Sequence, residues 1–228
     1  MQPNSFLIPH QSLIVSCQAP VDSPLHHPLI IAAMAETAIR QGAVGVRIDT
    51  PAHIQAVRER ISAPIIGLWK QSLPKYEIYI TPKFEAAVAI AEAGADMIAI
   101  DATLRSRPPG ESVPEMIDQI HQKLDKPVMA DIDCLEAALQ AVEAGADCVA
   151  TTLYGYTPQT QNQSPPGFEL LQAMVKQIDI PVICEGGIAT PEMAKLAIEV
   201  GADAVVVGTA ITGIDRLVQL YQTAINLR

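Results

Sequence analysis

One recurring phrase constrains the fold of this chain more than any other feature. The copies, in chain order, are RQGAVGVRID, EAGADMIAID, EAGADCVATT and EVGADAVVVG, of which the first is the weakest. Each copy contains a glycine that suits the left-handed position just beyond a helix end, and an apolar run of strand formers follows it. These glycines lie 52, 51 and 56 residues apart, at Gly42, Gly94, Gly145 and Gly201. That spacing leaves room for two strand–helix units per repeat.

A second type of strand begins at a proline and alternates with the first. Its copies are APIIGLWK, KPVMADID and IPVICEGG, and proline is tolerated at the first residue of a strand. With LIVSC near the N-terminus, the predicted strands are 13–17, 44–49, 64–68, 97–101, 127–131, 147–152, 181–185 and 203–207. Helical patterns separate them, among them PAHIQAVRERI and PEMAKLAIEV, each with proline at its first position behind a threonine cap, Thr50 or Thr190.

Strands that are apolar on both faces and alternate with amphipathic helices indicate a parallel sheet. Eight units without a break in composition predict an α/β fold, a single (βα)₈ TIM barrel that forms one domain over residues 1–228. A doubly wound open sheet is built from the same units and is the alternative. The fourfold spacing favours the closed barrel.

Composition excludes several classes of protein. The chain is 49% hydrophobic and 18% charged with a net charge of −10, which disfavours nucleic acid or an anionic membrane as partner. No apolar run could span a bilayer, and the first twenty residues lack a basic segment and contain Pro3 and Pro9, so we expect no signal peptide. The four cysteines and five histidines show no metal-binding spacing. We therefore expect a cytoplasmic protein with reduced thiols and no metal.

Ionisable residues follow three of the proline-led strands in matching register. Asp131 and Glu185 each lie four residues past the proline, and Lys70 lies six past it, so all three side chains are expected on the same face. The carboxyl ends of barrel strands carry the active site in this fold. Solvated loop residues are the alternative interpretation.

Arg47 stands inside the apolar strand AVGVRID, where an unpaired guanidinium would be costly. It is either a ligand anchor next to Lys70 or a structural partner of Asp49 or another carboxylate. Gln18, just past the first strand, is uninformative by itself.

Glycine turns follow the last two strands, in EGGIAT and VVVGTAIT. Gly186, Gly187, Gly208 and Thr209 offer backbone N–H groups that lead toward helix N-termini, which is where such barrels bind phosphate. Simple tight turns are the alternative. Two further loops border the same rim, with Arg105 and Arg107 in 102–112 and a lid-like composition in 151–167, although solvated arginines and a disordered loop fit equally well.

A lysine and a glutamate over a bound sugar phosphate suit proton transfer at a carbon next to a carbonyl. Burial and the Arg47 cation would both lower the pKa of Lys70 and leave it neutral, as a base must be. A lysine on a barrel strand can also form a Schiff base, as in a lyase or synthase. The chemistry of the residues leaves these two open.

The chain also resembles a known family. The chain contains, in order and over nearly its whole length, motifs similar to those of the N-acetylmannosamine-6-phosphate 2-epimerases: VSCQAP, GVRID, GLWK, YITP, DATLRSRPPGE, ADI, TTLYGYTPQT, EGGI and GTAIT. The resemblance implies a cytoplasmic, often homodimeric isomerase of amino-sugar and sialic acid breakdown that exchanges this sugar phosphate with N-acetylglucosamine 6-phosphate without a metal or organic cofactor.

The resemblance also implies roles for single residues. Lys70 matches the base at C2 of the open-chain sugar, and Glu185 matches its acid or hydroxyl-orienting partner. Three residues match those that hold the sugar and its N-acetyl group: Gln18, Arg47 and Asp131. The phosphate would bind the backbone N–H groups of Gly187, Gly208 and Thr209.

One departure from the family pattern bears on the phosphate. The family commonly continues the last motif with Arg-Pro, but this chain has Gly213 and Ile214 there. Arg216, three residues beyond Gly213, is the candidate replacement. A catalytically silent sugar-phosphate-binding barrel is the remaining alternative, and the lost arginine is its only support.

Overall fold

Eight parallel strands close into a barrel in which each strand pairs with the next and β8 pairs with β1. The computed structural model describes residues 8–226. The strands are β1 (Ser12–Cys17), β2 (Gly45–Asp49), β3 (Ile65–Leu68), β4 (Met97–Asp101), β5 (Val128–Asp131), β6 (Cys148–Ala150), β7 (Val182–Glu185) and β8 (Ala204–Val207). The predicted strands agree with these to within two residues at each end, and the closed barrel is confirmed over the open sheet. Residues 1–7 lie outside the described residues, and they include part of the N-terminal stretch in which we expect no signal peptide.

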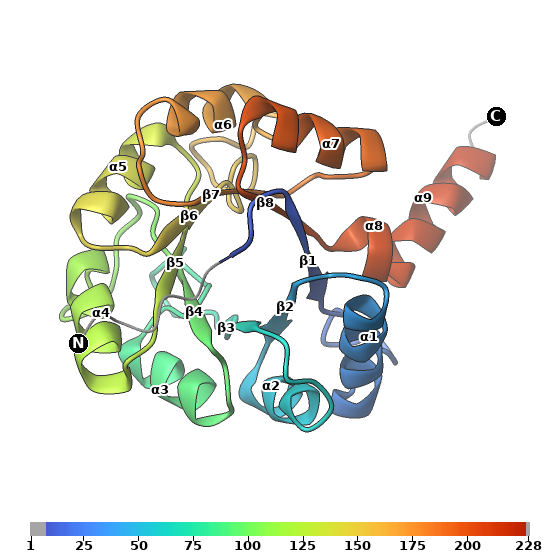
Figure 1. Cartoon of the computed structure of the whole chain (residues 1–228), viewed down its shortest axis with the longest axis horizontal. Helices are drawn as coiled ribbons and strands as arrows, with labels where there is room; N and C mark the ends of the chain where they lie inside the picture. Colours follow the sequence, from blue (N-terminus) through green and yellow to red (C-terminus); the bar gives the residue numbers. More distant parts are fainter. Residues whose placement is uncertain (1–7, 227–228) are drawn as a thin grey trace.

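Helices surround the barrel (Figure 1). They are α1 (Pro28–Arg40), α2 (Pro51–Arg58), α3 (Phe84–Glu92), α4 (Val113–Gln119) with a π-helical turn η1 (Ile120–Leu124), α5 (Leu135–Glu143), α6 (Phe168–Val175), α7 (Pro191–Val200), α8 (Thr209–Thr212) and α9 (Ile214–Asn226). In the described part of the chain, none of them combines the length and the apolar character needed to cross a membrane.

The aspartate of the repeated phrase joins neighbouring strands. Asp96, Asp147 and Asp203 each accept a hydrogen bond from the backbone N–H that follows the proline of the preceding strand, at 2.8, 2.7 and 2.7 Å. Their own backbone N–H groups donate back to the same strands. The two strand types therefore alternate because the phrase supplies the carboxylate and the proline-led strand supplies the free N–H at its start.

Alternate residues of each strand face inward, as the pleat requires. Apolar side chains such as Ile66, Met97, Met129 and Ile183 fill the lower part of the barrel interior. The other face of the strands packs against the helices in a larger cluster. Because the interior is filled from below, polar residues of the inward register can reach solvent only at the carboxyl ends of the strands.

The predicted helix ends are largely confirmed. All four repeat glycines have left-handed backbone angles, with φ between 95° and 116°. Thr190 caps α7 through its side chain, which accepts from the Met193 N–H. The predicted cap at Thr50 is wrong: its side chain makes no capping hydrogen bond and its φ is +74°. The backbone N–H of Thr50 donates instead to Leu68 O, so pairing with the end of β3 sets its conformation.

The C-terminal helix α9 projects away from the barrel (Figure 1). Its apolar residues at helical spacing, Ile214, Val218, Tyr221 and Ile225, are all exposed. No α9 side chain among those described is buried. This helix thus presents an apolar face that no other part of residues 8–226 covers.

Candidate active site

A cavity of about 830 Å³ opens at the carboxyl ends of the strands. It brings together residues that are far apart in the sequence, among them Gln18, Arg47, Lys70, Glu185, Gly187, Gly208 and Thr209. Of the residues predicted to act in catalysis or to bind substrate, only Asp131 is absent from this lining. Asp131 is fully buried behind Arg47.

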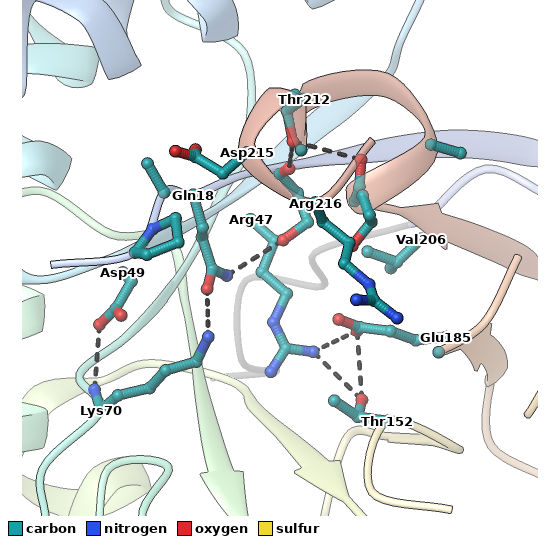
Figure 2. Close-up of a pocket in the computed structure, with 18 of the residues that line it drawn as sticks. Gln18, Arg47, Asp49, Lys70, Thr152, Glu185, Val206, Thr212, Asp215 and Arg216 are labelled. Carbon is teal, nitrogen blue, oxygen red and sulfur yellow. Dashed lines mark hydrogen bonds and ion pairs between the residues drawn. The ribbon is translucent and has the colours of Figure 1, made fainter. Parts of the chain in front are cut away.

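Arg47 is the centre of a buried charged network (Figure 2). Its two terminal nitrogens donate to the two carboxylate oxygens of Asp131, at 3.0 and 2.5 Å, and Nη1 also donates to Glu185 Oε2. Two carboxylates thus balance the cation, which makes its burial tolerable. Of the predicted structural partners, a neighbouring carboxylate is observed and Asp49 is not. The Nε of Arg47 is buried without a hydrogen-bond partner among the described residues.

Thr152 lies among the same three groups. Its hydroxyl is 2.6 Å from Asp131 Oδ1 and 3.1 Å from Glu185 Oε2, and Arg47 Nη1 donates to it at 3.2 Å. The preceding residue, Thr151, holds the backbone of Glu185: its hydroxyl donates to Glu185 O and accepts from Glu185 N. Two consecutive threonines therefore fix both the main chain and the carboxylate of one residue.

Burial raises the pKa of Glu185 to about 7, although the Arg47 cation opposes the shift and the Asp131 carboxylate reinforces it. Only 12% of the Glu185 side chain is exposed, so water does little to solvate its charge. Near neutral pH this carboxyl is therefore present both as acid and as carboxylate.

A small hairpin after β3 positions Lys70. Lys70 bridges to Ile80, Thr81 N donates to Trp69 O, and the Lys70 backbone N–H donates to Asp49 Oδ1 at 3.0 Å. The YITP motif is the returning arm of this hairpin. The lysine is thus held by main-chain contacts on both sides, and its side chain is free to reach into the cavity.

The Lys70 amine donates to Gln18 Oε1 at 2.5 Å, and Gln18 Nε2 donates to Ser16 Oγ at 3.0 Å. Surrounding protein lowers the pKa of Lys70 by desolvation, the Asp49 carboxylate raises it and Arg47 lowers it further. The net direction is downward, as predicted. Asp49 partly offsets the effect, which the sequence argument did not include.

The glycine turns after β7 and β8 also line the cavity. Gly186 and Gly187 have φ of 100° and 69°, and a Cβ at Gly187 would lie 2.5 Å from Pro165. Gly208 leads directly into α8, whereas three residues separate Gly187 from α7, so only the turn after β8 opens a helix as predicted. Arg216, on α9, also lines the cavity, and in Figure 2 its side chain extends toward Glu185.

The two arginines predicted near the rim after β4 are structural and not solvated. Arg105 Nη2 donates to Asp101 Oδ2 at 2.6 Å with only 5% of its side chain exposed. Arg107 donates to the backbone carbonyls of Asp101, Glu111 and Pro82. They fasten the loop 102–112 to the end of β4 and do not line the cavity. In the other loop, 151–167, Tyr156 contributes to the lining.

Sequence reasoning missed the threonines and Ser16. The register argument that found Asp131 and Glu185 applies to β6 as well, because Cys148, Ala150 and Thr152 alternate in the inward register. β6 does not begin with proline, so its residues could not be placed by counting from a strand-initial proline. Within residues 8–226, no group of three or more His, Cys, Asp or Glu side chains is arranged to hold a metal ion.

The arrangement suits proton transfer within the cavity. An amine whose pKa is lowered and a carboxyl whose pKa is raised line one cavity, and in Figure 2 the Arg47 guanidinium lies between them. General acid–base catalysis works best when both pKa values approach the working pH. The glycine turns and Arg216 add a region suited to an anion.

Known proteins are similar to this chain over almost its whole length. A family model described as "Putative N-acetylmannosamine-6-phosphate epimerase" matches residues 31–227. Proteins named "Putative N-acetylmannosamine-6-phosphate 2-epimerase" are 59% identical in Synechococcus elongatus and 61% identical in Thermosynechococcus vestitus, over 95% and 94% of this chain and 94% and 93% of theirs.

Solved structures agree. That of the N-acetylmannosamine-6-phosphate 2-epimerase from Clostridium perfringens is 42% identical with a TM-score of 0.91, over 95% of this chain and 94% of that one. Thiamine phosphate pyrophosphorylase from Pyrococcus furiosus has a TM-score of 0.59 at 18% identity over 90% and 89% of the two chains, which shows the shared fold alone. The extent of the match decides the family: this chain belongs to the N-acetylmannosamine-6-phosphate 2-epimerase family.

Proposed function

We propose that this chain is an isomerase that interconverts N-acetylmannosamine 6-phosphate and its C2 epimer, N-acetylglucosamine 6-phosphate. The observation that carries the proposal is the pairing, in one cavity, of a lysine with a lowered pKa and a glutamate with a pKa of about 7. The C2 hydrogen of the open-chain sugar lies next to the C1 aldehyde, which makes it acidic enough for a neutral amine to remove.

In the proposed reaction Lys70 takes the C2 proton and the electron pair of the C–H bond forms the enolate. Return of a proton, from the Lys70 ammonium or from the Glu185 carboxyl, to the other face of C2 regenerates the aldehyde with inverted configuration. Glu185 serves as the acid or as the group that orients a sugar hydroxyl, and Gln18 directs the Lys70 amine through their 2.5 Å hydrogen bond.

We assign the remaining contacts by chemistry. Arg47 and Asp131 form a rigid, charge-balanced unit, and Arg47 lines the cavity, where it would help to hold the sugar or its N-acetyl group. The N–H groups of Gly187, Gly208 and Thr209 would bind the phosphate, with Arg216 as an added cation.

Incubation with N-acetylmannosamine 6-phosphate, followed by proton NMR, tests the proposal. We expect both epimers at equilibrium with the native protein and no conversion with Lys70→Met. Treatment with borohydride during turnover separates the Schiff-base alternative, because only that reaction would leave the sugar covalently attached to Lys70. A folded native protein that converts no amino-sugar phosphate would support the silent binding protein instead.

The cellular setting belongs to the same proposal. The four cysteines are free, as expected in a reducing cytoplasm, where the enzyme would serve the breakdown of amino sugars and sialic acid. We further propose a homodimer, supported by the exposed apolar face of α9. Sedimentation equilibrium at micromolar concentration should give twice the mass of the chain, and a monomer there would contradict this part.

A further inference from the structure

The hydroxyl of Thr152 has one proton and two carboxylates within reach. It lies 2.6 Å from Asp131 Oδ1 and 3.1 Å from Glu185 Oε2, and Arg47 Nη1 donates to its oxygen. A hydroxyl donates one hydrogen bond but can accept two. The shorter distance favours donation to Asp131, which leaves the Thr152 oxygen able to accept a proton donor on the side of Glu185.

Glu185 gains a suitable partner in either protonation state. As an acid it can donate its proton to Thr152 Oγ while Thr152 donates to Asp131. As a carboxylate it can accept from Thr152 once the hydroxyl rotates, while Arg47 continues to donate to both carboxylates. The two states differ only in the position of protons, and Thr151 holds the Glu185 main chain in place through two hydrogen bonds.

We propose that Thr152 is a positioning residue that lets Glu185 gain and lose its proton in place. The inference rests on the proposed function for its catalytic consequence but not for its structural part. Without the hydroxyl both protonation states lose a hydrogen bond, but the carboxylate loses the stronger, charge-assisted one, so the acid form would be favoured. The charged groups that face Glu185 are then Arg47 and Asp131, with Lys70 and Arg216 also lining the cavity.

The experiment compares Thr152→Val with Thr152→Ser, and uses Thr151→Val as a matched control. The Glu185 carboxyl is titrated by carbon NMR in each protein, with its signal assigned from Glu185→Gln. We expect Thr152→Val to raise the pKa of Glu185 by about one unit, because a hydrogen bond to a charged group is lost. Thr152→Ser keeps the hydroxyl and should leave the pKa of Glu185 close to that of the native protein. Thr151→Val removes an equally small hydroxyl whose hydrogen bonds to Glu185 involve only the main chain, so the pKa of Glu185 should change much less.

A Glu185 pKa in Thr152→Val equal to that of the native protein would overturn the inference, as would equal shifts in Thr152→Val and Thr151→Val. If Thr152→Val does not fold, Thr152→Ala provides the same comparison.

In the epimerisation assay, kcat of Thr152→Val should fall roughly tenfold or more with a shifted pH profile. A shifted carboxyl pKa with an unchanged kcat would overturn the catalytic part. If the native protein has no epimerase activity, the proposed function fails while the titration still decides the role of Thr152.

Discussion

Replacing Arg47 with methionine tests the charged network on which the site depends. Arg47 is 1% exposed and Asp131 is fully buried, so removal of the guanidinium leaves two carboxylates facing each other with little water to solvate them. Breaking a buried ion pair by removing one partner costs about 3–5 kcal/mol. Methionine keeps most of the side-chain volume, so lost packing adds little. For a chain of this size we expect the melting temperature to fall by roughly 6–20 °C.

The size of this loss should depend on pH. In the native protein the pKa of Glu185 is raised from 4.5 to about 7, so the folded state binds this proton more tightly than the unfolded state. Such a group lowers the free energy of unfolding as pH rises from the unfolded pKa to the folded one. Without the Arg47 cation the folded pKa rises further, and the decline continues above pH 7. The destabilisation by Arg47→Met should therefore be larger at pH 8.5 than at pH 5.5.

Thermal denaturation at both pH values measures the effect, with Arg40→Met as the matched control. Arg40 also pairs with a glutamate, Glu36, but its side chain is 73% exposed, so its loss should cost less than about 1 kcal/mol. Equal melting temperatures for the two variants, or an Arg47→Met effect that shrinks as pH rises, would refute this account of the network.

Two further predictions concern other parts of the chain. Arg216→Ala should raise KM for the sugar phosphate several-fold and leave KM for the unphosphorylated sugar unchanged; an unchanged KM for the phosphate would rule out Arg216 as the replacement for the family arginine. The Asp147 hydrogen bond raises the pKa of His121, so the charged histidine stabilises the fold below the unfolded pKa, and this contribution is lost as pH rises through the folded pKa. His121→Ala should therefore lower the free energy of unfolding more at pH 5.5 than at pH 8.5. Because the pair is about one-third exposed, the difference between the two pH values should be under about 1 kcal/mol. Thermal denaturation measures it, and a loss of stability that does not depend on pH would contradict the pairing.

The barrel could be predicted from the sequence because each repeat contains residues that mark where its helix ends and its strand begins. A glycine beyond a helix end and a proline at a strand start are local requirements of the backbone, so they can be read without knowing the fold. The register of Asp131 and Glu185 followed from their distance along the chain from the proline that begins each strand. Lys70 lies beyond the end of β3, where only the hairpin with Ile80 and the Asp49 contact fix its direction.

Contacts between segments that are distant in the chain could not be predicted from the sequence. The repeat aspartates could not be matched to the strands they hold, since Asp96 and Ile65 are 31 residues apart and nothing local links them. The partners of Arg47 lie 84 and 138 residues away, and a carboxylate only two positions along the chain looked as suitable. Thr50 failed as a cap because pairing with β3, not helix propensity, sets its backbone.

The central claim is that the cavity exchanges the proton at C2. Proton NMR in D₂O with N-acetylmannosamine 6-phosphate tests it most directly, because a proton removed by Lys70 can be replaced from the solvent. We predict that the epimer formed carries deuterium at C2 and that Lys70→Met forms neither epimer nor deuterated substrate. Epimer that forms with C2 fully protonated throughout, or formation of deuterated epimer by Lys70→Met, would contradict the account.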